Sequence, residues 1–347
     1  MKKLKKNLLI FPLISLFLLV GCSKGSNIDP LSRTEFFMGT VVKISLYDNQ
    51  NEAILTEAFN RIEEIESLVS INTVDSQSEL DKVNASAGIK PVEVSDTTFN
   101  IVEKGLEFSK LSEGSFDITV GPLVKLWSIG LEGAKVPTLT EINEVLPLIN
   151  YNDVELDKVN NTIFLKNPDM IIDLGSIAKG YAADEVSKIL SENNVSSAII
   201  DLGGNIYAHG IKPSGDNWKI GIQNPFTDRG SIIGVHEVKD KTVVTSGIYE
   251  RYIEEDGVKY HHLLDPKTGY PFDNEIAGIS IIADKSIDAD ALSTTVFSKG
   301  LVDGFNFIES IENVDAIFID RDYNVYLTDG IKNFEVDNSD FKLSTIN

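Results

Sequence analysis

After Pro30 the chain continues for more than three hundred residues without a low-complexity linker or an internal repeat. A chain of this length can bury a large core, and its 42% of hydrophobic residues is ordinary for a globular protein. Length alone would allow two domains. Because no linker separates two halves, we expect one large domain or two closely packed lobes.

The N-terminus has the pattern of an export signal. Four lysines within the first six residues precede an apolar stretch over 8–20, which ends in Leu19-Val20-Gly21-Cys22. This pattern is typical of a secretory signal with a lipobox, and the apolar stretch is short for a membrane span, which needs roughly 20 residues. We expect a signal peptide over 1–21, a lipid-bearing Cys22 with a tether over 22–33, and a folded domain over 34–340. Acyl chains on Cys22 would hold that domain on the extracytoplasmic face of the cell membrane.

Cysteine content and charge exclude several classes of protein. Cys22 is the single cysteine, so the folded domain has no disulfide, no thiol nucleophile and no cysteine-ligated metal. The formal net charge is −22, which disfavours nucleic acid as a partner because phosphate backbones require clustered Lys and Arg. An anionic small substrate would need a local cation or a bound metal.

Helix and strand patterns alternate without the regular rhythm of strand–helix–strand units, which predicts an α+β fold with a mixed or antiparallel sheet and flanking helices. A β-hairpin is expected where 154–157 and 162–165 flank Asn160-Asn161. The predicted helices cover 52–70, 98–111, 141–148, 177–193, 286–298 and 301–311, and the predicted strands include 35–47, 170–174, 198–202, 218–222, 243–245, 249–254, 316–319 and 325–327.

The segment from Asp173 to Gly180 suggests a phosphate site. A strand that stops at Gly175 and enters a helix exposes free N–H groups, and the helix dipole favours an anion there. Lys179 in the first turn would reinforce the site, and Asp173 at the strand end can hydrogen-bond a base or a ribose. A plain strand-to-helix connection with a surface lysine explains the segment equally well.

Asp290, Ser293 and Thr294 share one face of the predicted helix over 286–298. A carboxylate and two hydroxyls are hard oxygen ligands suited to Mg²⁺, which keeps waters and substrate oxygens in its remaining positions. The alternative is a buried polar face whose hydroxyls bond to helix carbonyls.

Histidine is scarce, and His262 opens the run His262-Leu263-Leu264-Asp265-Pro266-Lys267-Thr268-Gly269. A neutral imidazole beside a phosphate site can act as a general base for a hydroxyl nucleophile. His262 could instead cap the turn that Asp265 starts, and His261 competes for either role. Zinc hydrolysis is disfavoured because the chain has no His-Glu-x-x-His segment.

Seven segments in this order resemble the ApbE family of FAD:protein FMN transferases. They are M-G-T at 38–40, G-S-F-D-I-T-V-G-P-L-V-K-L-W at 114–127, D-L-G-S-I-A-K-G-Y-A-A-D at 173–184, D-L-G-G-N at 201–205, T-S-G at 245–247, H-L-L-D-P-K-T-G at 262–269 and A-D-A-L-S-T-T at 289–295. The resemblance spans the chain from about Phe36 to the C-terminal strands. It implies a single α+β domain of the T-fold-like type.

The resemblance also implies a reaction and its residues. The reaction is Mg²⁺-dependent transfer of FMN from FAD to a threonine hydroxyl of another protein, with release of AMP. His262 would be the base, and Ser293 stands where some members have Asp, which weakens the third side-chain ligand of the metal. The implied FAD contacts are Met38, Asn72, Ser115, Phe116, Asp117, Asp173, Lys179 and Leu264, and the implied metal ligands or neighbours are Ser176, Asp290, Ser293 and Thr294.

Alternatives to this activity remain open at the level of sequence. Attack by water would make the protein an FAD pyrophosphatase that gives FMN and AMP. A lipoprotein that stores FAD without turnover, or one that binds another solute, would also have a lipobox and nucleotide-like loops. Acceptors in this family carry an Asp-Gly-x-Ser/Thr-Gly-Ala-Thr type segment, which this chain lacks, so we expect it to modify a partner, an electron-transfer protein of the envelope.

Overall fold

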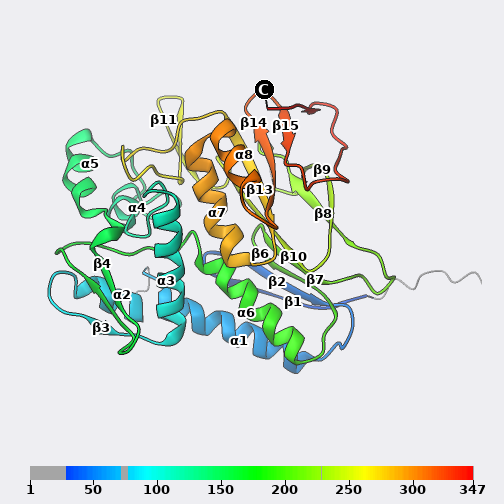
Figure 1. The fold of residues 1–347 in the computed structure, drawn as a ribbon, viewed down its shortest axis with the longest axis horizontal. Coiled ribbons are helices and arrows are strands. Elements are labelled where there is room, and N and C mark those ends of the chain that lie inside the picture. The colour runs from blue at the N-terminus through cyan, green and yellow to red at the C-terminus, as the bar shows by residue number, and fades with distance from the viewer. Residues whose placement is uncertain (1–28, 72–76, 228, 347) are drawn as a thin grey trace, which may run out of the picture.

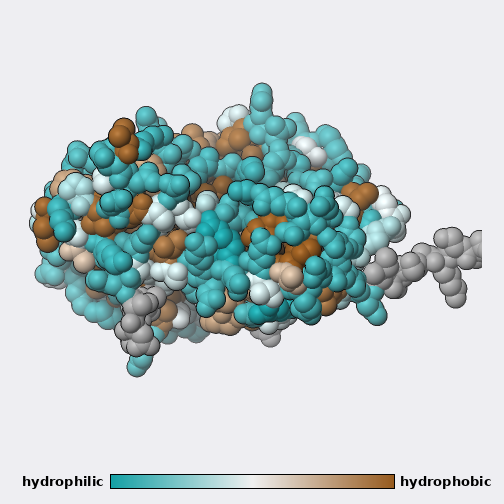
Figure 2. All heavy atoms as spheres, turned by 90° about the horizontal axis from the view of Figure 1, so that it is seen from below, coloured by the Kyte–Doolittle hydropathy of each residue, from teal (hydrophilic) through white to brown (hydrophobic). Residues whose placement is uncertain are grey.

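The computed structural model describes residues 29–71, 77–227 and 229–346. The predicted signal peptide, Cys22 and Asn72 lie outside the described residues. Within the described ranges, no helix is long and apolar enough to cross a membrane. The surface in Figure 2 is mostly hydrophilic with scattered hydrophobic patches, as the excess of acidic residues leads one to expect.

A nine-stranded sheet forms the centre of the molecule (Figure 1). Its neighbouring strands are antiparallel except for the last pair, so the predicted mixed or antiparallel sheet is confirmed. The strand order is β1 (Leu31–Phe37), β2 (Thr40–Leu46), β6 (Ser197–Leu202), β7 (Asn205–Gly210), β10 (Lys241–Gly247), β13 (Ile276–Ala283), β14 (Asp315–Asp320), β15 (Asn324–Leu327) and β17 (Lys342–Leu343).

The two faces of this sheet are covered differently. Because side chains of a strand alternate between faces, Ile281 of β13 packs into the core beneath the helices and Ile282 into a second core on the opposite face. The result is three layers, with helices on one side and a small sheet on the other. The helices are α1 (Glu52–Val69), α6 (Ala178–Glu192), α7 (Ser286–Lys299) and α8 (Leu301–Glu309), and the small sheet consists of β16 (Glu335–Val336), β9 (Ile232–Val238) and β8 (Trp218–Gln223).

The remaining elements form an extension at one end of the helical layer (Figure 1). A third core surrounds Trp127, whose indole N–H donates to the carbonyl of Gly269 over 2.8 Å. Tyr260 packs on the same indole, with ring centroids 5.5 Å apart. The elements are α2 (Glu79–Ala85), β3 (Val92–Glu93), α3 (Asp96–Leu111), α4 (Gly121–Trp127), α5 (Leu139–Val145), the 3₁₀ turns η1 (Leu146–Leu148) and η2 (Tyr151–Asp153), β4 (Val154–Asp157), β5 (Thr162–Leu165), β11 (Tyr252–Glu255) and β12 (Val258–His261).

Most predicted elements are present, including the hairpin of β4 and β5 and the long helices α1, α3, α6, α7 and α8. The single strand predicted over 35–47 is wrong, because Met38 and Gly39 turn the chain with φ of 51° and 70° and separate β1 from β2. The strand predicted over 170–174 is also wrong, since this extended segment makes one bridge, from Ile171 to Val120. The short helices α2 and α4 were not predicted.

Candidate functional site

Helices α6 and α7 cross in close contact at Gly180. A Cβ on Gly180 would lie 2.3 Å from the carbonyl oxygen of Ser286, so a side chain there has no space. The Gly180 N–H donates to Oδ2 of Asp290 over 2.9 Å. The crossing therefore fixes the N-terminal turn of α6 against the second turn of α7.

Asp290 is 5% exposed and lies at the centre of this crossing. Its Oδ2 accepts the Gly180 N–H, and its Oδ1 lies 3.7 Å from Nζ of Lys179. The lysine also donates to the carbonyl of Gly175 over 3.1 Å. Two of the predicted site residues, 111 positions apart in sequence, are thus direct neighbours.

The other predicted metal ligands differ in burial and in hydrogen bonding. Ser293 is buried and shares a 2.8 Å hydrogen bond with Ser246 of β10, while its hydroxyl donates to the carbonyl of Asp290 over 2.7 Å. This is the helix-carbonyl bond that the alternative interpretation predicted. Ser176 and Thr294 are partly buried.

These residues would fit Mg²⁺ if water and substrate oxygens supplied its remaining ligands. The described residues contain no group of three or more His, Cys, Asp or Glu that could hold a metal ion. Asp290 supplies one carboxylate, a hard oxygen ligand, and its Oδ1 lies 3.7 Å from the ammonium group of Lys179. Mg²⁺ commonly binds through one or two carboxylates together with waters and phosphate oxygens, so this donor set is compatible with it.

Asp173 lies beside the N-terminal turn of α6. Its Oδ1 accepts the Gly175 N–H over 2.7 Å, and its own N–H donates to Ile118 over 2.8 Å. Burial raises the pKa of Asp173, while the Gly175 N–H and the positive charges of Arg251, Lys125 and Lys179 act in the opposite direction. The predicted phosphate site therefore has fewer free N–H groups than an unpaired helix end, because the amides of Gly175 and Gly180 already bond to carboxylates.

The two adjacent histidines differ in their contacts. His261 is 5% exposed, its Nε2 lies 2.9 Å from the carbonyl of Phe272, and its Nδ1 accepts the Leu263 N–H over 3.3 Å. Both of its ring nitrogens are therefore engaged, which requires the proton on Nε2. The buried Nδ1 of His262, by contrast, has no partner among the described residues. Of the two, His262 is the histidine with a ring nitrogen that no described residue engages.

The surroundings of His262 favour its neutral form. Burial and, after it, the positive charges of Arg251 and Lys179 together lower the pKa of His262 to about 3, so the ring is unprotonated at neutral pH. His262 does not cap the following turn, because the Asp265 carboxylate accepts from the N–H of Lys267 and the hydroxyl of Thr268, each over 2.9 Å. Lys179 acts on both Asp173 and His262, which places the three in one neighbourhood.

The segment 115–117 has a largely structural set of contacts. Asp117 accepts from the N–H and hydroxyl of Thr119 over 2.8 and 2.7 Å and from the Tyr151 N–H over 3.0 Å. Burial raises its pKa. Ser115 accepts a 2.8 Å bond from Ser298 at the end of α7. Phe116 is 2% exposed, and its N–H and carbonyl both bond to the Ser112 hydroxyl, so this residue is closed to a ligand in this structure.

Met38 and Leu264 make their contacts outside the group of Asp173, Lys179 and Asp290. The Met38 N–H donates to Glu66 of α1 over 2.7 Å, and Thr40, two residues later, touches the Gly203 backbone, where a Cβ would lie 1.8 Å from the Thr40 hydroxyl. These contacts join the segments 38–40 and 201–205. Leu264 is 8% exposed and packs in the core around Trp127.

Arg251 was not predicted as a site residue. It precedes β11, and its charge acts on both Asp173 and His262. No motif marks it in the sequence. The structure reveals it through the register of the hairpin formed by β11 and β12, because Arg251 falls opposite His262 when the hairpin is extended by one pair.

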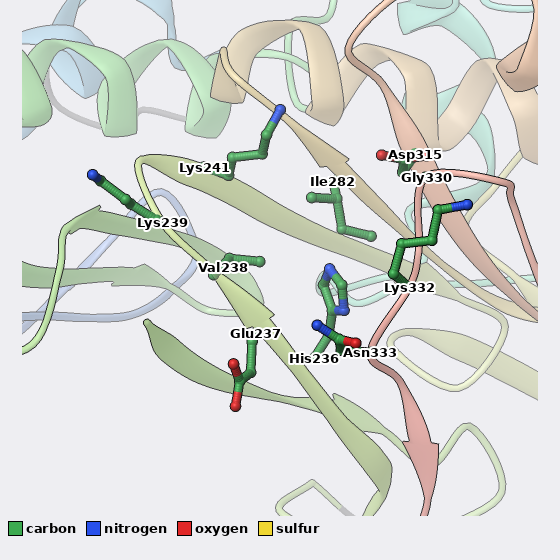
Figure 3. Close-up of a pocket in the computed structure, with 10 residues that line it drawn as sticks. All are labelled: His236, Glu237, Val238, Lys239, Lys241, Ile282, Asp315, Gly330, Lys332 and Asn333. Carbon is green, nitrogen blue, oxygen red and sulfur yellow. The ribbon is translucent and has the colours of Figure 1, made fainter. Parts of the chain in front are cut away.

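Two cavities lie away from these residues. One of about 220 Å³ is lined by residues of β9, β10, β13 and β14 and by the segment 330–333, and Figure 3 shows Lys239, Lys241 and Lys332 among its lining residues. The other, of about 510 Å³, is lined mainly by polar residues such as Asp273, Glu275 and Arg321. Among the described residues, none of the predicted site residues lines either cavity.

Residues 38–318 match the ApbE family. The chain is 37% identical over 297 residues to an FAD:protein FMN transferase of Klebsiella pneumoniae, covering 86% of this chain and 91% of that protein. It is 36% identical over 329 residues to an FAD:protein FMN transferase of Treponema pallidum, covering 90% of each.

Solved structures are similar over the same extent. The ApbE protein of Thermotoga maritima superposes with a TM-score of 0.80 at 30% identity, covering 87% of this chain and 98% of that one. The flavin transferase ApbE of Vibrio cholerae gives a TM-score of 0.78 at 28% identity, covering 88% and 99%. The predicted α+β fold is therefore confirmed as that of a single domain.

Proposed function

Because the chain belongs to the ApbE family, we propose that it is an FAD:protein FMN transferase that moves FMN from FAD to a threonine hydroxyl of a partner protein and releases AMP. The assignment of the general base rests on one observation: His262 is a neutral imidazole with an unpaired Nδ1, and it lies near Lys179 and Asp173. A neutral histidine at this place can accept a proton, whereas the neighbouring His261 has both nitrogens engaged.

In the proposed reaction, His262 takes the proton of the acceptor hydroxyl as its oxygen attacks the FMN-side phosphorus of FAD. A new P–O bond forms between the acceptor oxygen and FMN, and the P–O bond to the AMP phosphate breaks. AMP leaves with the bonding electron pair. Lys179 supplies positive charge at the pyrophosphate, where negative charge develops.

We assign the FAD contacts to Met38, Ser115, Phe116, Asp117, Asp173, Lys179 and Leu264, with Asn72 outside the described residues. Asp290, with Thr294 and Ser176 beside it, would hold Mg²⁺ through hard oxygen atoms. Ser293 would adjoin the metal, since its hydroxyl already bonds to Ser246 and to the Asp290 carbonyl. Bound Mg²⁺ would neutralise pyrophosphate charge and favour departure of AMP.

The location and the partner belong to the same proposal. The pattern from the apolar stretch over 8–20 to Cys22 supports export and lipid anchoring to the extracytoplasmic face of the cell membrane. The partner would be an electron-transfer protein of the envelope with an Asp-Gly-x-Ser/Thr-Gly-Ala-Thr type segment. Such a partner would lie in the same compartment as an exported, lipid-anchored enzyme.

The test uses the soluble protein from Ser23 onward with FAD and Mg²⁺, with and without an acceptor domain that carries this segment. AMP release and acceptor mass are followed. AMP together with an acceptor mass gain equal to FMN establishes the transferase. AMP and free FMN without acceptor labelling would indicate a pyrophosphatase, and tightly bound FAD without AMP would indicate a binding protein.

A further inference from the structure

Arg251 and His262 face each other at the base of the hairpin formed by β11 and β12. The register pairs Tyr252 with His261, so the next pair outward is Arg251 with His262, and the His262 N–H donates to the Arg251 carbonyl over 3.1 Å. Side chains of directly opposed residues in an antiparallel pair project from the same face, with Cβ atoms about 5 Å apart. The guanidinium group of Arg251 and the imidazole of His262 therefore share one side of the hairpin.

Arg251 forms no ion pair among the described residues. The other four arginines, Arg33, Arg61, Arg229 and Arg321, each form an ion pair with a carboxylate, whereas no ion pair of Arg251 exists among the described residues. This is notable in a chain of net charge −22. An exposed guanidinium without a carboxylate partner is available for an anionic ligand.

The Arg251 side chain has a defined course. Its Cδ lies against the backbone of Gly130, where an added Cβ would be 2.9 Å away. The aliphatic part of the side chain is thus packed on the loop after α4, and the charged end acts on both Asp173 and His262. A positive charge therefore lies near both a predicted FAD contact and the predicted base.

We propose that Arg251 is a catalytic residue that binds the FMN-side phosphate of FAD. The inference rests on the proposed function. The planar guanidinium pairs with two non-bridging phosphate oxygens, holds the phosphorus beside His262 and stabilises the charge that develops as the acceptor oxygen attacks. The same pairing offsets the cationic field at His262, which makes the imidazole a stronger base when substrate is bound.

Binding of four ligands tests this assignment in Arg251→Gln, Arg251→Lys and the control Lys219→Gln, which removes the same charge from an exposed position of β8. The ligands are FAD, FMN, AMP and riboflavin without Mg²⁺. Arg251→Gln should weaken FAD and FMN by about 10- to 100-fold, the size of a lost charge-assisted bond, and leave riboflavin and AMP nearly unchanged. Arg251→Lys should fall between, because it keeps the charge and loses the fork.

Unchanged FMN affinity in Arg251→Gln would overturn the inference, as would an equal loss for all four ligands, which indicates a structural role. The pH profile of kcat/KM gives a second readout: removal of the cation should raise the pKa of His262 and move the acidic limb upward. If the intact protein neither binds nor cleaves FAD, the proposed function fails. If the intact protein does both and Arg251→Gln matches it, only the role of Arg251 fails.

Discussion

The α6–α7 crossing and the base of the β11–β12 hairpin both contribute to the candidate site, but they differ in how their polar groups are paired. At the crossing, Asp290 accepts the Gly180 N–H and Ser293 bonds to Ser246 and to the Asp290 carbonyl. At the hairpin base, the Nδ1 of His262 and the guanidinium of Arg251 have no hydrogen-bond or ion-pair partner, respectively, among the described residues.

This difference separates two kinds of contribution. A buried polar group without a partner costs about 1–3 kcal/mol of stability, so it persists where function uses it or where water satisfies it. Paired groups hold geometry. We therefore expect substitutions at the hairpin base to change mainly the reaction, and substitutions that alter packing at the crossing to change mainly the free energy of unfolding.

The largest effect is expected for His262→Ala. General base catalysis contributes typically 10²- to 10⁴-fold, so the rate of FMN transfer should fall by about that factor while FAD affinity and the melting temperature stay near those of the intact protein. The measurement is acceptor flavinylation under single-turnover conditions.

His261→Ala is the matched control. Because His261 bonds to Phe272 and Leu263, this variant should lose about 1–3 kcal/mol of stability and keep its transfer activity. Normal transfer by the His262 variant would remove this residue from the mechanism.

Gly180→Ala should give the largest loss of stability. The new Cβ would meet the Ser286 carbonyl at 2.3 Å, and backbone atoms on both helices cannot move aside as a flexible side chain can. Overpacking of this kind costs typically 1–3 kcal/mol and occasionally more, and we expect about 3 kcal/mol.

Urea unfolding measures the Gly180 effect, with Lys188→Ala on the exposed face of the same helix as the neutral control. Equal midpoints for the two variants would show that the crossing tolerates a wider separation.

The contrast between these regions could be predicted from sequence only in part. The spacing of Asp290, Ser293 and Thr294 correctly predicts a shared helix, because helical periodicity is local. That Asp290 binds an amide 110 residues earlier is a tertiary contact with no local signal.

The same limit applies to the histidines and to Arg251. His261 and His262 are equivalent in sequence, and they become distinct through the Phe272 carbonyl, which engages one of them. The strand predicted over 249–254 did not include its partner strand, so the pairing of Arg251 with His262 could not be foreseen. Met38 shows a related failure, since a non-glycine residue with a φ of 51° interrupts an otherwise alternating pattern.

Asp290→Asn sharpens the comparison because it changes charge with little change of shape. The amide oxygen can still accept the Gly180 N–H, so stability should fall by only about 1 kcal/mol, the difference between a charge-assisted and a neutral hydrogen bond. Activity at limiting Mg²⁺ should fall by 10-fold or more as the one carboxylate of the proposed site is lost. Unchanged activity across a Mg²⁺ titration would place the metal elsewhere.

The smallest effect concerns Asp184, which accepts the N–H groups of Ser286 and Ile287 at the start of α7. Burial raises its pKa from 3.8 to about 6, against the opposing effect of these two N–H groups. A raised pKa in the folded state means a stabilising contribution that is fully present below about pH 4 and is lost as the pH rises through about 6. Relative to Asp184→Asn, the intact protein should therefore gain stability as the pH falls from 7 to 4. Urea unfolding at both pH values measures this difference.

Asp157→Asn is the control of opposite sign, because hydrogen bonds from Asn160 and Val159 lower the pKa of Asp157. A difference between the intact protein and Asp184→Asn that does not change with pH would show that the start of α7 leaves this carboxylate as well solvated as it is in the unfolded chain.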